Sequence, residues 1–260
     1  MRISIQTVAR PAEVLTLVDG PSSNPWPVRG EVVGLERDGL EGWYSPASTR
    51  VDDQPDLPHL HGTYWPEAVY LSNRVLTIRG FHAAGIGSGS SLSAARLRDR
   101  VAALVGEVVM VTVDDPAGPR HVTGYVADAP GIDRLSERRS KFSLVISCPD
   151  PLKYGPRVDY SVSGASVLVL NSGTGPVAPV LTVSSRVTVV DVQLGGSRVR
   201  WSGAADSLLL DLGDGRPLGP DGQETGVLIY ADALRVPPGE HRLTVTCDGS
   251  LTVSVRSGWK

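Results

Sequence analysis

The sequence predicts a mainly β protein, with an α+β domain of one helix packed on antiparallel strands followed by an all-β sandwich. The 260 residues include 29 Gly and 20 Pro, a composition typical of many tight turns and short strands. Helical periodicity is clear in one stretch, before residue 106, and the last hundred residues alternate strand-like runs with turn residues. These observations favour two domains of different character.

A proline-rich segment, residues 148–164, separates the two halves. Each proline fixes φ, removes a backbone donor and biases the preceding residue toward extended geometry. We therefore predict a first domain at 1–147, a connector at 148–164 that no helix or central strand crosses, and a β-sandwich at 165–260. The connector prolines are Pro149, Pro151 and Pro156.

Charge and cysteine content exclude several classes of protein. The net charge is −3, and residues 1–150 carry 15 basic and 18 acidic side chains, which argues against a basic nucleic-acid clamp. Cys148 and Cys247 fall in opposite halves, so two free, buried thiols are expected rather than a disulfide. With no signal-like apolar segment and no ~18-residue apolar run, we expect folding in a reducing cytoplasm and no membrane insertion.

The first domain begins with alternating apolar residues. Residues 1–20 predict a strand pair that turns at Pro11, and residues 28–35 predict another strand, with a turn at Asp38 and Gly39. Residues 45–66 form a long polar segment rich in proline, and loops of this length are usually functional. We predict a contact loop there.

The rest of the first domain contains the predicted helix. Residues 68–80 predict a hairpin that turns at Ser72 and Asn73. Residues 91–105 predict the helix, because apolar residues recur at three- and four-residue spacing. Ser91 or Ser93 can cap its start and Gly106 its end. The apolar face consists of Leu97, Val101, Leu104 and Val105, and the strands expected afterwards are 108–113, 120–127 and 141–147.

The sequence of the second domain predicts eight short strands separated by Gly, Pro and Asp turn residues. The spacing of these turns is typical of a jelly-roll-like or similar sandwich. The predicted strands are 167–170, 180–183, 187–194, 198–201, 207–211, 227–230, 241–246 and 251–255.

Two histidines offer a possible metal site. His59 and His61 are two residues apart, so a strand would place both on one face, near Asp52, Asp53 and Asp56. The alternative is an ordinary polar loop. Because no cysteine or third histidine supports a site, we predict no metal ligands.

Two other motifs resemble loops that bind phosphate or calcium. The run GIGSGSS, which includes Gly85, Gly87 and Ser90, precedes the helix as a phosphate loop would, but it lacks the P-loop lysine and a parallel βαβ context. A hinge into the helix is the alternative. Asp211 and Asp214, with Asp221, could suggest calcium, yet glycines stand where an EF-hand needs ligands, so hairpin turns are expected.

Neither nucleic-acid binding nor catalysis has a clear signature. Arg134, Arg138, Arg139 and Lys141 form the densest basic run, but interleaved acids favour a solvated hairpin face over nucleic-acid contact. There is no G-x-S-x-G nucleophile elbow. We predict no enzyme activity, no catalytic or metal-binding residue and no cofactor.

The order of short motifs resembles that of the distal tail proteins of siphophages, which join the tail tube to the tip. The resemblance covers nearly all of residues 28–260, except the loop 45–66. It includes an "N-x-G" strand end, a strand ending in Asp and a "PG" turn. The resembling segments are RVLTIRG, LSAARLRDRVAALV, FSLVISCPDPLKY with its DP-x-x-Y pattern, SVLVLNSGTGPVAPVLTV, SLLLDLGDGRPL and LRVPPGEHRLTV.

The resemblance implies a virion structural protein located at the phage tail tip and assembled in the host cytoplasm. It implies a homo-hexameric ring formed by the first domain and a galectin-like sandwich that projects outward. The implied partners are further copies of the chain, the tail tube protein and tip or receptor-binding proteins. DNA would pass through the ring without specific binding.

Two alternatives come from other classes of protein. A carbohydrate-binding or host-receptor-binding module carried on a tail would use Trp201, Trp259 or Tyr230 as a stacking surface. A cell-wall hydrolase would need a placed carboxylate pair or a metal site, and the sequence assembles neither.

Overall fold

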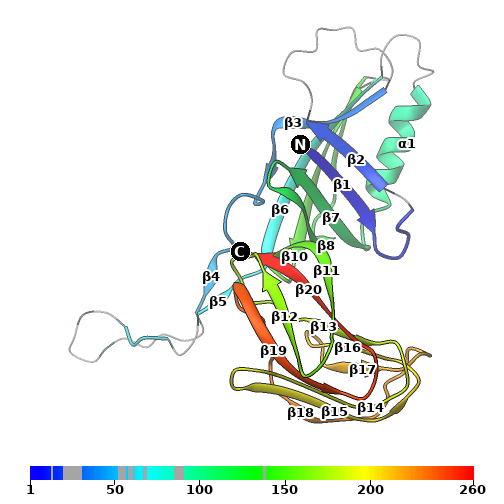
Figure 1. The fold of residues 1–260 in the computed structure, drawn as a ribbon. Helices are drawn as coiled ribbons and strands as arrows, with labels where there is room; N and C mark the ends of the chain where they lie inside the picture. The colour runs from blue at the N-terminus through cyan, green and yellow to red at the C-terminus, as the bar shows by residue number, and fades with distance from the viewer. Residues whose placement is uncertain are drawn as a thin grey trace. The chain divides into compact units, whose positions relative to one another are not determined.

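A computed structural model describes residues 1–12, 14–19, 31–51, 57, 61, 63–66, 69–84, 91–136 and 139–260. The chain divides into two compact units, residues 1–152 and 153–260 (Figure 1). The boundary lies inside the segment predicted to be a connector. The prediction of a mainly β protein with one helix is confirmed for the described residues.

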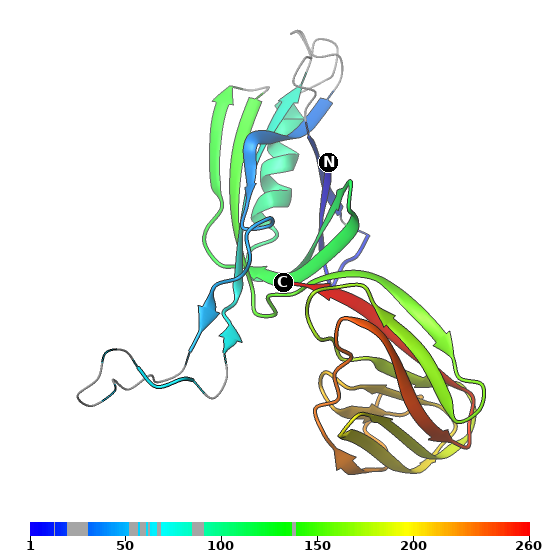
Figure 2. The same cartoon turned by 60° about the vertical axis from the view of Figure 1, so that its left-hand side comes forward.

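Unit 1 is a strand barrel. Its strands run in the order β8-β7-β1-β2-β3-β6-β10-β9, and β8 also pairs with β10, which closes the sheet on itself (Figure 2). Neighbouring strands are antiparallel except β2 and β3, which are parallel. The predicted pair at residues 1–20 is confirmed as β1 and β2. The strands are β1 (Arg2–Thr7), β2 (Val14–Asp19), β3 (Glu31–Glu41), β4 (Thr49–Arg50), β5 (Tyr70–Leu71), β6 (Arg74–Ala84), β7 (Val108–Asp115), β8 (Gly118–Val126), β9 (Gly131–Ser136) and β10 (Arg139–Cys148).

The helix α1 (Ser91–Ala102) packs against β6 and β10 (Figure 2). Leu97, Val101 and Leu104 are buried in the barrel core, as their spacing predicts. The helix ends three residues before the predicted boundary, and Val105 is exposed, contrary to the prediction. Tight backbone turns follow, up to Gly106, which has a φ of 80°. The capping side chains and residues 85–90 lie outside the described residues.

Two local predictions in unit 1 are wrong. Strand β3 runs through Asp38 and Gly39, where a register shift between Leu35 and Leu40 marks a bulge, not a turn. Strand β5 pairs with β4 at Arg50 and Tyr70, so residues 68–80 do not form a hairpin. β6 instead lies between β3 and β10. In both places turn-favouring residues interrupt regular strand pairing without forming the predicted turn.

Unit 2 is a sandwich of two antiparallel sheets, ordered β17-β16-β13-β20-β11 and β12-β19-β14-β15-β18. All eight predicted strands are confirmed. In most of them, such as β12, β13 and β16, inward residues alternate with outward ones. β11 and β17 were not predicted. The strands are β11 (Lys153–Ser161), β12 (Ser166–Asn171), β13 (Val180–Val183), β14 (Val187–Leu194), β15 (Ser197–Ala205), β16 (Leu208–Asp211), β17 (Arg216–Leu218), β18 (Val227–Ala231), β19 (Gly239–Cys247) and β20 (Leu251–Trp259).

The prediction that no central strand crosses residues 148–164 is wrong. Strand β11 occupies Lys153–Ser161 and pairs with β20. Its register shifts between Tyr154 and Arg157, so Pro156 lies in a bulge, where a missing backbone N–H removes no regular ladder bond. Pro149 and Pro151 lie in the turn before the strand.

Candidate assembly site

A buried arginine organises one end of unit 1. Arg74, the first residue of β6, is 2% exposed. Its Nε donates a hydrogen bond to the Pro151 carbonyl at 2.8 Å, and its Nη1 donates to the carbonyls of Gly42 and Ser45, each at 2.7 Å. Its Nη2 is buried without a hydrogen-bond partner. One guanidinium thus ties together three chain segments that are far apart in sequence.

The thiol beside this guanidinium remains neutral. Burial raises the pKa of Cys148 to about 11, although the Arg74 charge opposes the shift. Burial also lowers the pKa of Arg74. Cys148 is therefore a packed thiol near neutral pH and not a thiolate partner for the arginine. Both cysteines are free, as predicted. Cys148 is buried as expected, but Cys247 is partly exposed, contrary to the prediction.

Arg74 holds the base of a segment that we call the arm, the described residues 45–51, 57, 61, 63–66 and 69–71. The arm starts and ends as the short β4–β5 ribbon, and the Ser72 amide donates to the Ser48 carbonyl at 2.8 Å. Before it, Gly42 has a φ of 80°, and a Cβ there would lie 2.0 Å from the Val75 carbonyl oxygen. The backbone at the arm base therefore requires glycine.

The arm presents aromatic side chains to solvent. Trp65 is 95% exposed, and Tyr64 and Tyr70 are about half exposed. Exposed aromatic groups of this size are uncommon on a surface without a partner and mark interaction sites. The prediction of a contact loop at residues 45–66 remains a prediction.

We expect Arg74→Met to loosen the arm base. The substitution keeps the apolar stem but removes three hydrogen bonds to carbonyls that are only partly buried, which corresponds to about 2 kcal/mol of unfolding free energy. Urea denaturation measures the loss, and hydrogen exchange at the Ser72 amide should accelerate. The control is Arg79→Met, which breaks an exposed ion pair with Glu41 and should change stability by less than about 0.5 kcal/mol. Equal effects of the two substitutions would contradict a clamping role for Arg74.

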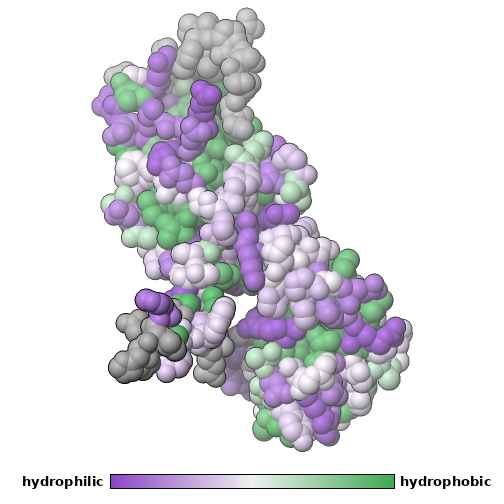
Figure 3. Space-filling model, turned by 90° about the vertical axis from the view of Figure 1, so that its left-hand side faces the viewer, coloured by the Kyte–Doolittle hydropathy of each residue, from purple (hydrophilic) through white to green (hydrophobic). Residues whose placement is uncertain are grey.

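A second surface lies at one end of the barrel, on neighbouring strands. Val108 and Tyr125 are register partners, the Val8 amide donates to the Val108 carbonyl at 2.9 Å, and Ser147 lies between Tyr125 and Val75. Val8, Val108, Tyr125 and Val75 are each about half exposed. We call these four residues the apolar row. Figure 3 shows hydrophobic side chains that interrupt the hydrophilic surface on one face of the protein.

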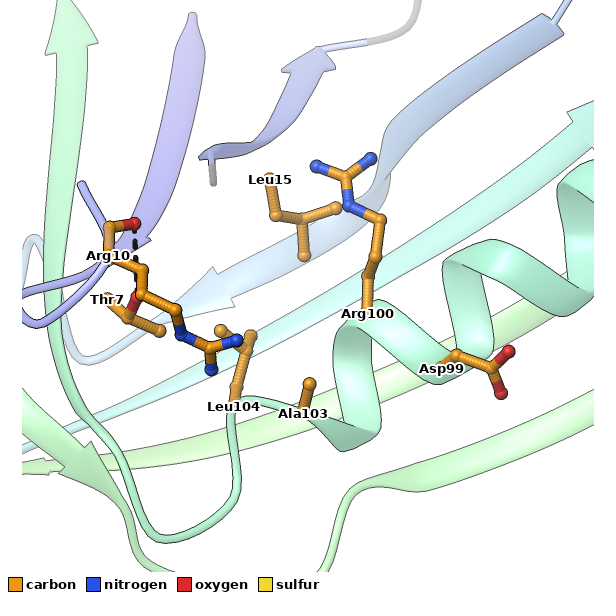
Figure 4. A pocket seen from close by; sticks show the side chains of 7 residues that line it. All are labelled: Thr7, Arg10, Leu15, Asp99, Arg100, Ala103 and Leu104. Atoms are coloured by element: carbon orange, nitrogen blue, oxygen red, sulfur yellow. Dashed lines mark hydrogen bonds between the residues drawn. The ribbon is translucent and has the colours of Figure 1, made fainter. Parts of the chain in front are cut away.

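A small pocket of about 210 Å³ lies between α1 and the β1–β2 turn. Arg10 forms an ion pair with Glu107 at 3.3 Å, and Arg100 donates to the Val14 carbonyl at 2.5 Å. Figure 4 shows Asp99 pointing away from both guanidinium groups. Both arginines therefore have partners within the chain. The other residues that line the pocket are Thr7, Leu15, Ala103 and Leu104.

The structure describes little of the possible metal site. Asp52, Asp53, Asp56 and His59 lie outside the described residues, and His61 alone is described. Across the described ranges, no three His, Cys, Asp or Glu side chains come together to hold a metal ion.

The aspartates of residues 211–221 form turns, as predicted. Asp211 accepts a hydrogen bond from the Gly213 amide, and Asp214 accepts one from the Arg216 amide. Asp221 likewise accepts from the amide two residues later. Each carboxylate closes its own local turn.

The basic run lies on the β9–β10 hairpin, as predicted. Asp133 is the register partner of Lys141, whose Nζ also forms an ion pair with Glu36 at 2.7 Å. Arg134 and Arg139 are both exposed on this hairpin, and Arg138 lies outside the described residues. A solvated face with mixed charges accounts for the run.

The proposed sugar-stacking residues do not form one surface. Trp201 is fully buried, and its Nε1 donates to the Thr225 carbonyl at 2.7 Å, so the suggestion that it stacks on a ligand is wrong. Trp259 is partly buried and packs closely over Gly155. Tyr230 is exposed, with the Arg198 guanidinium 4.7 Å from its ring centre.

The "N-x-G" motif has a structural explanation that sequence reasoning missed. Asn171 is fully buried, and its Nδ2 donates to the carbonyls of Gly175 and Val236 at 2.8 and 3.0 Å. Its Oδ1 accepts from the amides of Gly173 and Gly258 at 3.0 and 3.4 Å. One amide group thus joins the end of β12 to two other parts of unit 2.

The DP-x-x-Y motif also has a structural role. Asp150 accepts a hydrogen bond from the Leu152 amide at 3.0 Å, which closes a turn, and Pro151 presents its carbonyl to Arg74. The motif therefore shapes the end of unit 1. The order of motifs was the available signal for these positions, whereas nothing in the sequence distinguishes Arg74 from the other arginines.

Among the described residues, no helix has the length and apolar character to cross a membrane. No protein family and no curated protein matches the sequence. Similarity to solved structures is nevertheless extensive. The SPP1 Dit protein, a paradigm of the hub adsorption apparatus in Gram-positive infecting phages, matches with a TM-score of 0.62 and 20% identity, covering 86% of this chain and 93% of the other.

Two baseplate structures of phage P2 also match. A chain of the activated baseplate with Ca has a TM-score of 0.55 and 8% identity, covering 99% of this chain and 98% of the other. The activated baseplate with Sr gives 0.51 and 8%, covering 98% of both chains. The resemblance drawn from the motif order is thus supported by an independent comparison of structures. The chain has the fold of the SPP1 Dit hub protein and of these phage P2 baseplate chains.

Proposed function

We propose that this protein is a structural component of a long non-contractile phage tail, located in the virion at the tail tip. It assembles as a ring, a hexamer, at the distal end of the tail tube, connects the tube to tip and receptor-binding proteins, and leaves a channel for DNA. The observation that carries the proposal is the likeness to the SPP1 Dit hub protein over 86% of this chain and 93% of the other.

The surfaces of unit 1 support assembly. A ring closes when one patch on each copy meets a different patch on the next. The apolar row and the exposed aromatics of the arm are two such patches on different parts of the unit. Burial of apolar side chains is the main favourable contribution to protein association.

The charge of the first 150 residues supports the channel. They carry 15 basic and 18 acidic side chains. A domain with that balance has no excess positive charge to bind phosphates, and affinity for DNA rises with the number of phosphates neutralised. DNA can then move past the ring without specific binding. The proposed role requires no catalysis and no cofactor.

The proposal predicts that the purified chain forms a closed ring and that the apolar row contributes to it. Light scattering after size-exclusion chromatography should give the mass of a hexamer, and negative-stain images should show a central hole. The double substitution Val108→Glu and Tyr125→Glu should shift the protein to monomers, because it places charges in the apolar row. Both side chains are half exposed, so the melting temperature of the monomer should change little.

The matched control is Leu168→Glu, which adds a charge at an exposed leucine of unit 2. The control protein should remain in rings. A wild-type chain that stays monomeric at about 100 μM, well above ordinary assembly affinities, would count against the ring. Rings that survive the double substitution would remove the apolar row from the interface.

A further inference from the structure

Strand β18 leaves an apolar sheet edge open in unit 2. It pairs with β15 on one side, and no strand in residues 139–260 pairs with its other side. Val227 is 66% exposed, Ile229 54% and Tyr230 47%. Unpaired backbone groups on an apolar edge are a template for another strand, and proteins usually protect such edges with charge, proline or cover.

Two other edges of the sandwich carry the protection that β18 lacks. On β12, the Leu170 amide donates to the Tyr160 hydroxyl at 3.2 Å, so a side chain of the same unit covers that edge. β17 is three residues long and contains Pro217. The β18 sequence, VLIYA, contains neither proline nor charge. The β18 edge is therefore exposed without the protection that the β12 and β17 edges have.

A pocket of about 210 Å³ lies beside the open edge. Its apolar lining includes Val199, Leu210, Leu212 and Leu228, and Ala231 of β18 lines it as well. Val199 and Ala231 are register partners, which places Ala231 on the inner face of the sheet. A strand added to β18 would direct alternate side chains to this inner side, where the pocket can receive an aliphatic group.

The carboxylates around the pocket and on the outer face already have partners. Asp214 accepts from the Arg216 amide at 3.0 Å, and Asp232 accepts from the Arg198 amide at 2.8 Å. Asp191 accepts two hydrogen bonds from the Arg198 guanidinium, which hold the pKa of that carboxyl below its usual range. These three carboxylates are therefore satisfied within the chain.

Two cations near the edge are less engaged. The Arg200 Nε has no hydrogen-bond partner and lies 3.9 Å from Asp191 Oδ2, which Arg198 already holds. Arg235, on the pocket rim, makes no hydrogen bond or ion pair within the contiguous described residues 139–260. Arg200 is the register partner of Tyr230, so it shares the outer face with that exposed ring. Asp214 and Asp232 still carry their negative charge on the pocket side, so the positive excess lies on the outer face, where Arg198 and Arg200 flank one carboxylate, Asp191.

We propose that the open edge of β18 binds an extended segment of a partner protein in which aliphatic side chains alternate with carboxylates. The segment's backbone pairs with β18, its aliphatic groups enter the pocket, and its carboxylates lie on the outer face near Arg200. The bulge at Ile229 leaves Tyr230 and Ala231, beside the pocket, for regular pairing. This inference uses unit 2 alone and stands whether or not the chain forms a ring.

The test uses the full chain and a fluorescein-labelled peptide of sequence Glu-Leu-Glu-Val-Glu-Leu-Glu, followed by fluorescence anisotropy. Binding of the acidic peptide should saturate. The peptide with Lys in place of every Glu should bind at least about tenfold more weakly, because its lysines would be repelled by Arg200. Hydrogen exchange should show slower exchange at residues 227–231 when the acidic peptide is present. Equal binding of the two peptides, no binding at 1 mM or unchanged exchange would overturn the proposal.

Three single variants locate the site. Arg200→Gln should weaken the acidic peptide about fivefold, the range of one exposed ion pair. Arg235→Gln should weaken it less, because Arg235 lies on the pocket side, away from the peptide's carboxylates. Ala231→Trp should fill the pocket and weaken binding more than about tenfold. The matched control is Arg242→Gln, which changes an exposed arginine on β19 of the same sheet. This variant should bind the peptide as the unmodified chain does.

Circular dichroism and thermal melting verify that each variant is folded. Loss of binding in Arg242→Gln to the same extent as in Arg200→Gln would overturn the site, because it would indicate general attraction to a basic sheet. Protection of residues 227–231 that grows with protein concentration in the absence of peptide would also overturn it. A second copy of the chain would then occupy the edge.

Discussion

Substitution of Asn171 by Leu is expected to destabilise unit 2 by about 4 kcal/mol or more. Leucine keeps the branched shape of asparagine but is larger, so overpacking adds to a loss that comes mainly from polar groups. The carbonyls of Gly175 and Val236 and the amides of Gly173 and Gly258 all lose their hydrogen bonds to this side chain. Each buried polar group left unsatisfied costs about 1–3 kcal/mol. Urea denaturation followed by the fluorescence of buried Trp201 measures the effect.

Asn171→Asp gives a pH signature that a packing defect would not. The introduced carboxylate faces two carbonyl oxygens and is buried, so folding raises its pKa above the unfolded value of about 3.9. The folded state therefore binds the proton more tightly, and stability recovers as the pH falls through the raised pKa. Stability of this variant that is independent of pH between about 4 and 7 would contradict the assigned role.

Gly226→Ala is expected to cost about 3 kcal/mol or more of unfolding free energy. Gly226 has a φ of 67°, and a Cβ there would lie 2.5 Å from Cε2 and Nε1 of the Trp201 ring. The fully buried ring cannot move without losing its core packing and its hydrogen bond to Thr225. Thermal or urea unfolding measures the loss.

Gly222→Ala is the matched control. Gly222 has a φ of 74°, and a Cβ at this position would meet no atom within 4 Å, so substitution there costs only the left-handed backbone, about 1 kcal/mol. The difference between the two variants isolates the contact with Trp201. Equal losses would show that backbone conformation alone requires glycine at position 226.

The strands of unit 2 could be predicted because local signals agree with the fold. In β13 and β14, inward apolar residues alternate with outward ones, and turn residues bound each run. β11 was missed because its prolines suggested a break, whereas the register shift beside Pro156 accommodates one. β9 was missed because its residues are almost all exposed and show no apolar alternation.

Pairing partners and buried polar residues could not be predicted in the same way. Ser72 and Asn73 separate β5 from β6 as expected, but these strands pair elsewhere, with β4, β3 and β10, through contacts distant in sequence. Arg74 begins an ordinary strand, and its three carbonyl partners come from residues 42, 45 and 151. Only the tertiary structure brings this guanidinium and its carbonyl partners together. The position of Asn171 could be singled out from the sequence, because the N-x-G motif is part of the family resemblance, but its hydrogen bonds could not.

The closed barrel of unit 1 has two narrow seams. Among the described residues, β2 and β3 share two register pairs, and β8 and β10 share two. These seams divide the barrel into one half made of β8, β7, β1 and β2 and another made of β3, β6, β10 and β9. Cooperative opening follows the boundaries with the fewest backbone hydrogen bonds. The barrel is therefore expected to open by separation of these two halves at the β2–β3 and β8–β10 seams. The strands within each half stay paired, and the free energy of this opening is below that of global unfolding.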